Sequence, residues 1–148
     1  MRITASIVLC FLRAFGALAV LVCGGCGSGP TLVPVTGRVL LEGKPAAGAY
    51  VRFHPEGGER GAPLPSARVQ EDGSFRLATL LPGESSPRAG APPGRYAVTV
   101  MLRAPSPRGD SDERDLLPPR YLDPAASGLT AVVAEGATEV PPFNLAKR

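Results

Sequence analysis

Apolar and polar residues alternate along several short segments after residue 34, which is the pattern of β-strands that bury one face. The segment 35–41, VTGRVLL, places every second residue on one face. The segment 95–102, RYAVTVML, is the most regular, with Tyr96, Val98, Val100 and Leu102 on one face. Together with similar segments they make seven predicted strands: 35–41, 49–54, 68–70, 75–77, 95–102, 129–134 and 138–145.

Turn-forming residues separate these segments. The 17 prolines and 18 glycines cluster between them, as in Glu42-Gly43-Lys44-Pro45 and in the Asp72-Gly73 pair, which favours a hairpin between 68–70 and 75–77. Pro141-Pro142 interrupts the last strand, which should therefore lie at a sheet edge or a bulge. No long helical periodicity follows residue 25. The pattern predicts an all-β, seven-stranded β-sandwich.

Few large side chains are available for the core of this sandwich. The inward-facing set holds three aromatic candidates, Phe53, Phe75 and Tyr96. We therefore expect a small core and a modest stability.

Residues 1–25 form a different kind of segment. Two arginines, Arg2 and Arg13, precede the uncharged apolar run AFGALAVLV at 14–22, and no acidic residue occurs before Cys26. A basic start, an apolar run of roughly 7–15 residues and small residues before a cleavage point define a secretory signal peptide. A transmembrane span would place Arg13 in the middle of its apolar stretch, at a cost of roughly 2.5–3.5 kcal/mol. Residues 1–25 are therefore predicted to be a signal peptide.

The Cys23-Gly24-Gly25-Cys26 stretch admits a redox or metal interpretation and a lipidation interpretation. A redox pair needs a βαβ context, and zinc needs two further ligands, whereas the chain has one histidine, His54, and one other cysteine, Cys10. The stretch resembles the cleavage site of bacterial lipoproteins, in which two small residues precede the lipid-modified cysteine. Cys26 fits that position, although Cys23 stands where leucine is usual. The resemblance implies a membrane anchor through lipid on Cys26, and Gly27 in place of Asp favours the outer membrane.

Removal of residues 1–25 leaves 123 of the 148 residues, enough for one domain, and lowers the formal charge from +3 to about +1. A nearly neutral mature chain favours no nucleic acid partner. Cys26 would be its only cysteine, so we expect no disulfide. We interpret 26–34 as a flexible tether and 35–148 as the folded domain.

Three motifs occur in a fixed order along that domain: VTGRVLLEGKPAAGAYVRF at 35–53, EDGSFRL at 71–77 and PPGRYAVTV at 92–100. As a set they resemble the carboxypeptidase regulatory-like domain, which has a transthyretin-like, or prealbumin-like, β-sandwich fold. The tail at 118–130 is similar to the end of small bacterial lipoproteins that carry this domain. The resemblance implies a non-catalytic module outside the cytoplasm.

Candidate catalytic chemistry is sparse. A Ser-His-Asp site would have to use His54, which the alternation places on the outward face near a strand end. We expect a solvated or loop-bonded histidine there, with no catalytic residue, no bound metal and no cofactor.

The sequence therefore favours a lipid-anchored cell-envelope protein, facing the periplasm or the exterior, that acts as a binding or structural module. Its ligand would be a glycan, a peptide or another envelope protein, held by the long loops at 56–67, 79–93 and 103–120. Tyr50 and Tyr121 are the residues expected to be exposed for sugar stacking. The alternatives are a soluble secreted β-sandwich module and a small hydrolase or CxxC redox protein.

Overall fold

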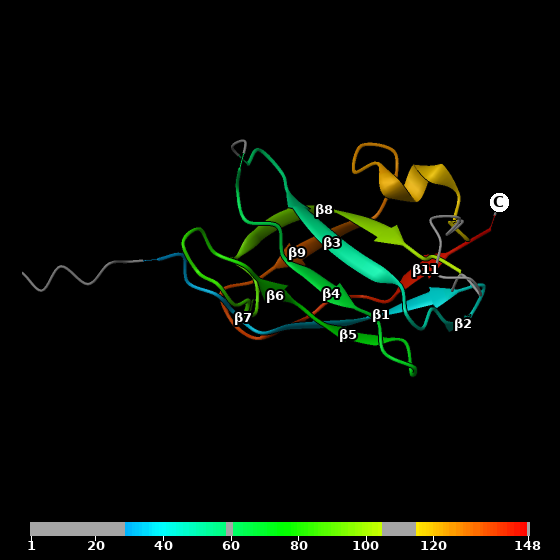
Figure 1. Cartoon of the computed structure of the whole chain (residues 1–148), viewed down its shortest axis with the longest axis horizontal. Coiled ribbons are helices and arrows are strands. Elements are labelled where there is room, and N and C mark those ends of the chain that lie inside the picture. The colour runs from blue at the N-terminus through cyan, green and yellow to red at the C-terminus, as the bar shows by residue number, and fades with distance from the viewer. Residues whose placement is uncertain (1–28, 59–60, 105–114, 148) are drawn as a thin grey trace, which may run out of the picture.

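The fold was obtained as a computed structural model that describes residues 29–58, 61–104 and 115–147 (Figure 1). The predicted signal peptide and Cys26 lie outside the described residues. The regular secondary structure of the described chain is almost all strand, arranged in two sheets, which confirms the all-β sandwich.

The first sheet is organised around β1 (Val35–Leu41). One edge of β1 pairs antiparallel with β5 (Ser74–Arg76) and then with β2 (Lys44–Pro45). The other edge pairs in parallel with β10 (Thr138–Glu139) and then with β11 (Phe143–Leu145). β1 is therefore the strand that joins every other member of this sheet.

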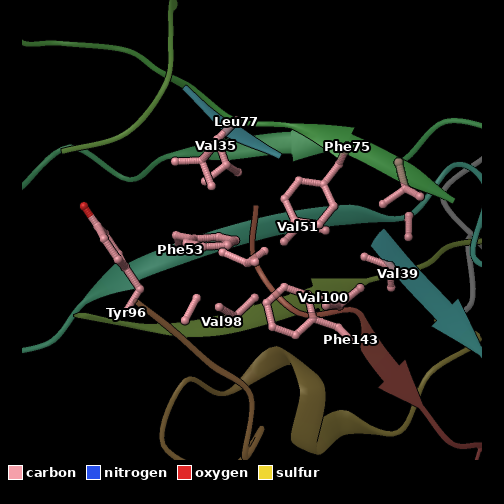
Figure 2. Packing of buried hydrophobic residues seen from close by; sticks show 14 of the residues in the cluster. Val35, Val39, Val51, Phe53, Phe75, Leu77, Tyr96, Val98, Val100 and Phe143 are labelled. Atoms are coloured by element: carbon pink, nitrogen blue, oxygen red, sulfur yellow. The ribbon is translucent and has the colours of Figure 1, made fainter. Parts of the chain in front are cut away.

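The second sheet packs against the first through its inner face (Figures 1 and 2). Its strands run in the order β7 (Arg88–Ala89), β6 (Ala78–Thr79), β4 (Ser66–Arg68), β3 (Tyr50–Pro55), β8 (Gly94–Met101) and β9 (Thr130–Val133). The central pair, β3 and β8, is antiparallel over six residue pairs. A short 3₁₀ helix, η1 (Pro119–Leu122), lies next to β8. No helix among the described residues is long and apolar enough to cross a bilayer.

All seven predicted segments contain strand, but the described residues form eleven strand segments rather than seven. Three of the additional ones, β2, β6 and β7, are two residues long and lie in stretches predicted to be turns or loops. The last predicted strand divides into β10 and β11 at Pro141-Pro142, because proline has no N–H to donate to a sheet.

The predicted hairpin between 68–70 and 75–77 is wrong in its pairing. Its turn forms as expected: the Gln70 N–H donates to the Ser74 carbonyl at 2.8 Å, and Gly73 has a φ of 81°. The strands then part, since β4 pairs with β3 while β5 pairs with β1 in the other sheet. The turn at 70–73 therefore carries the chain from one sheet to the other. The alternation of apolar and polar residues within β4 and β5 does not indicate which strand each of them pairs with.

The alternation itself is confirmed on the three long strands. The inward residues of β1, β3 and β8 are buried, except that Leu41 is only partly buried, and the outward residues between them are more exposed, apart from Leu40, which matches Leu41, and Thr99. Figure 2 shows these side chains filling the space between the sheets. The buried members are Val35, Val39, Ala49, Val51, Phe53, Tyr96, Val98, Val100 and Leu102.

Four aromatic rings form the centre of the core (Figure 2). The Phe53 ring centroid lies 6.2 Å from that of Phe75, 5.6 Å from that of Tyr96 and 6.2 Å from that of Phe143. Each such pair contributes about 0.5–1.5 kcal/mol beyond the area it buries. Phe143 adds to the three predicted aromatic residues: β11 lies at a sheet edge, as the proline pair predicts, but its Phe143 side chain still packs against Phe53 of the other sheet.

Gly37 makes room for this cluster on β1. An added Cβ at Gly37 would lie 2.6 Å from Phe75 Cζ and 2.6 Å from Val140 Cγ2, well inside van der Waals contact. The Phe75 ring therefore packs directly over the backbone of β1, where no residue with a side chain would fit without displacement.

The folded part begins two residues before the predicted boundary at 35. Val33 is buried, and it exchanges two backbone hydrogen bonds with Ala91, at 2.9 and 3.0 Å. Residues 33–34 thus belong to the domain rather than to the tether.

Replacement of Gly37 by alanine should destabilise the domain by about 1–3 kcal/mol, because the new methyl group overpacks the core against Phe75 and Val140. Urea unfolding of the purified protein measures this. Gly136→Ala is the matched control, since an added Cβ there meets nothing within 4 Å, and it should change stability by less than about 0.5 kcal/mol. Equal effects of the two substitutions would show that the Phe75 ring does not pack on Gly37.

Candidate functional site

The outer face of the six-stranded sheet carries a group of polar side chains at β3 and β8. Because Val51 and Phe53 point into the core, Tyr50, Arg52 and His54 point away from it. Thr99 lies opposite Arg52 on β8 and therefore shares this outer face.

Leu122, at the end of η1, closes this group into a small pocket of about 140 Å³. Such a volume is well below the roughly 300–1,000 Å³ of pockets that enclose a whole small molecule. It would accommodate one group of a larger ligand. The lining residues, defined here as the β3–β8 pocket, are Tyr50, Arg52, His54, Thr99, Val100, Met101 and Leu122.

Tyr50, expected to be exposed for ligand stacking, is half-buried in this pocket. Its hydroxyl donates to Ser66 Oγ at 2.8 Å. The Arg52 guanidinium carbon lies 5.7 Å from the centroid of its ring, in cation–π geometry. The ring therefore supports the arginine rather than standing free for a sugar.

Tyr121 is not exposed, which corrects the prediction made for it. Only 5% of the residue is accessible, and its ring lies in η1 under the Arg120 guanidinium, whose carbon is 4.9 Å from the ring centroid. The Ala146 N–H donates to the Tyr121 hydroxyl oxygen at 3.0 Å, and this hydrogen bond lowers the pKa of the phenol. Tyr121 thus ties η1 to the end of β11. Alternation does not reveal a 3₁₀ turn, and the loop predicted at 103–120 ends inside η1.

His54 faces outward as predicted, but it is half-buried and hydrogen-bonded to a side chain rather than solvated. Its Nε2 lies 3.0 Å from Thr99 Oγ1, and that hydroxyl lies 3.5 Å from the Arg52 carbonyl oxygen. Burial lowers the pKa of His54, and the positive charge of Arg52 lowers it further. The imidazole is therefore neutral at pH 7.

A hydroxyl beside a histidine is one half of a nucleophilic pair, so the hydrolase alternative can be compared with this geometry. In the described chain no carboxylate hydrogen-bonds to His54, and its only charged neighbour in the pocket is cationic. A cation beside the imidazole disfavours the imidazolium that a general base must become. The arrangement is poorly suited to activate Thr99.

The described residues contain no group of three or more His, Cys, Asp or Glu side chains placed to hold a metal ion. The cysteines of the Cys23–Cys26 stretch lie outside the described residues, so the redox alternative stays untested. The predicted ligand loops are described only in part, because 59–60 and 105–114 are also outside. The loop predicted at 79–93 contains β7 and the second residue of β6.

Two other hollows lie away from the β3–β8 pocket. An open groove of about 740 Å³ runs between residues 47–48 and 68–72, where Arg68 is accompanied by Glu71 and Asp72. The Asp72 carboxylate already accepts from the Ser74 N–H and hydroxyl, at 2.9 and 2.6 Å. A second hollow of about 310 Å³ lies at the β1–β2 turn, where Lys44 and Lys147 are accompanied by Glu42. The mixed charge of the larger groove gives it no clear ligand preference.

The lowered pKa of His54 has a consequence for stability. The unfolded chain, with an ordinary pKa of 6.5, binds a proton at a pH where the folded chain does not. The free energy of unfolding should therefore fall as the pH drops below about 6.5 and level off below the folded pKa. His54→Gln should lose this part of the pH dependence, as measured by urea unfolding at about pH 7.5 and 5.5. Identical pH dependence in the two proteins would contradict the burial of His54.

The Tyr121 hydrogen bond and ring burial can be separated by two substitutions. Tyr121→Phe keeps the ring and should cost about 1 kcal/mol, since the Ala146 N–H loses its acceptor. Tyr121→Ala should cost roughly 3–5 kcal/mol, because it also leaves a cavity beneath η1. Both are measured by urea unfolding. A Tyr121→Ala variant as stable as the wild type would restore the view that Tyr121 is an exposed ligand contact.

Comparison of this chain with protein-family models, with curated proteins and with solved structures found no match. The β3–β8 pocket is the described site with the most distinct chemistry, since it brings a cation, an imidazole and a hydroxyl together.

Proposed function

We propose that this chain is a bacterial lipoprotein, anchored through lipid on Cys26, whose β-sandwich is a non-catalytic binding module of the cell envelope. The observation that carries the proposal is the arrangement of a basic, apolar leader and the Gly24-Gly25-Cys26 sequence seven residues before Val33, the start of the fold. The β3–β8 pocket, with its cation, imidazole and hydroxyl, is the proposed point of ligand contact.

The transthyretin-like assignment is part of this proposal. It is supported by the way the three sequence motifs fall on the structure. The first covers β1 to β3, the second the turn at 71–73 and β5, and the third β8. These strands supply Phe53, Phe75 and Tyr96, so the residues that carry the resemblance also build the core.

The short connection to Cys26 would hold the domain close to a membrane. Seven residue steps separate Cys26 from Val33, and at about 3.3–3.6 Å each they span at most about 25 Å. The chain enters the sandwich at the end near β7, opposite the end that holds β2 (Figure 1). In the anchored protein the β2 end would face away from the bilayer, in the periplasm or outside the cell.

Anchoring of this kind is strong because each buried CH₂ contributes about 0.8 kcal/mol, and two or more acyl chains make release negligible. Lipidation of Cys26 would also remove the last free thiol, since Cys10 and Cys23 leave with the signal peptide. The membrane is thus the first partner, and Gly27 after the cysteine favours the outer one in a two-membrane cell.

Intact-mass spectrometry of the protein extracted from bacterial membranes tests the anchor. We expect a chain that begins at Cys26 and carries diacylglyceryl mass, and loss of that mass in Cys26→Ala. Cys23→Ala is the matched control and should be processed as the wild type is. A cleaved chain without lipid would establish the soluble secreted module instead. A full-length, unlipidated chain would overturn the signal peptide and return Cys23 and Cys26 to consideration as a redox pair.

A further inference from the structure

The charge of the β3–β8 pocket points to the kind of group it would bind. Arg52 forms no ion pair with any described residue, and its one specific contact is with the Tyr50 ring. No acidic side chain lines the pocket. An arginine held against an aromatic ring loses less conformational freedom when it forms a bidentate pair with a carboxylate.

The aromatic residues argue against a sugar as the ligand. The chain has no tryptophan, three tyrosines and five phenylalanines, of which Phe11 and Phe15 belong to the predicted signal peptide. Arg52 covers Tyr50, and the remaining aromatic residues, all described, are buried. No ring outside the leader therefore offers an open face for stacking. The buried set is Phe53, Phe75, Tyr96, Tyr121 and Phe143.

Apolar surface adjoins the cation. Leu122 is 42% exposed, and the half-buried Met101 also lines the pocket. Methionine adapts its shape to different apolar partners. A peptide with a carboxylate beside an apolar side chain would match both features.

We propose that the β3–β8 pocket binds an acidic peptide segment of another envelope protein, with a carboxylate on Arg52 and His54 and an apolar neighbour on Leu122 and Met101. This inference rests on the proposed role of the domain as a binding module and names its ligand class. The Thr99 hydroxyl holds the His54 ring in place, 3.0 Å from Nε2.

Binding should strengthen as the pH falls. The titratable groups that line the pocket beside His54 are Tyr50 and Arg52, both on β3, while β8 and η1 contribute only uncharged residues to the lining. In the free protein Arg52 opposes protonation of His54. A bound carboxylate favours it, so the complex takes up a proton and gains affinity in acid.

The test uses the full processed protein, purified in a non-ionic detergent from the membrane fraction or, if it carries no lipid, from the soluble fraction. Its failure is therefore distinct from failure of the anchor. The probe is a dye-labelled peptide Leu-Glu-Leu-Glu-Leu, and fluorescence anisotropy measures its affinity. The Leu-Gln-Leu-Gln-Leu peptide and an oligogalacturonate serve as comparison ligands.

We expect the acidic peptide to bind more tightly than its glutamine counterpart, and more tightly at about pH 5.5 than at 7.5. Arg52→Gln should weaken binding about fivefold or more. Arg76→Gln is the matched control, because it removes the same charge from an exposed position on β5 in the other sheet, and it should change affinity less than about twofold.

Three outcomes would overturn the proposal. The first is no preference for the acidic peptide over the glutamine peptide. The second is equal weakening by Arg52→Gln and Arg76→Gln, which would mean unspecific attraction. The third is an oligogalacturonate that binds as well as the peptide, which would make the ligand an acidic glycan.

Discussion

The Phe75 ring, which packs over Gly37 within its own sheet, is the constraint that links this sheet to the other one. β1 joins all other strands of its sheet. Because Gly37 has no Cβ, the Phe75 ring can lie directly against the backbone of β1. The same ring contacts Phe53 of the opposite sheet and stacks on Phe143 at a centroid distance of 6.2 Å. The core has few large side chains, and this aromatic cluster supplies most of its aromatic area. Because the cluster joins residues of β1, β3, β5 and β11, a shift in the register of one of these strands would disturb the packing of the others.

That register also determines the outer face. Successive residues of a strand point to opposite sides, so a one-residue slip of β3 would bring Arg52 into the core and Phe53 into solvent. The burial of Phe53 therefore holds Tyr50, Arg52 and His54 outside, opposite their partners on β8. The pocket residues lie on two paired strands that pack on the core, and η1 lies beside them. A site on such strands is held more rigidly than a site on a loop.

The sequence predicted those parts of the fold that depend on local alternation. Strands β1, β3 and β8, the turn at 70–73 and the division at Pro141-Pro142 follow from residue type and spacing. The partner of β5 and the burial of Phe143 depend on contacts far apart along the chain. Tyr50 and His54 were placed on the correct face. Tyr121 was placed wrongly, because its burial requires the Ala146 N–H, 25 residues further along, and a 3₁₀ turn without a strong sequence signal.

Without residues 1–25, the proposed signal peptide, the chain is nearly neutral, and this also bears on how the surface would act. A charge of about +1 creates little long-range field, and salt screens exposed charges beyond about 8 Å. Selection of a partner must then come from short-range contacts. Arg52, fixed against Tyr50 and beside the neutral His54, has no competing acid in the pocket lining, whereas Arg68 in the larger groove shares its space with Glu71 and Asp72. Of these two hollows, the smaller one thus has the stronger preference for a carboxylate.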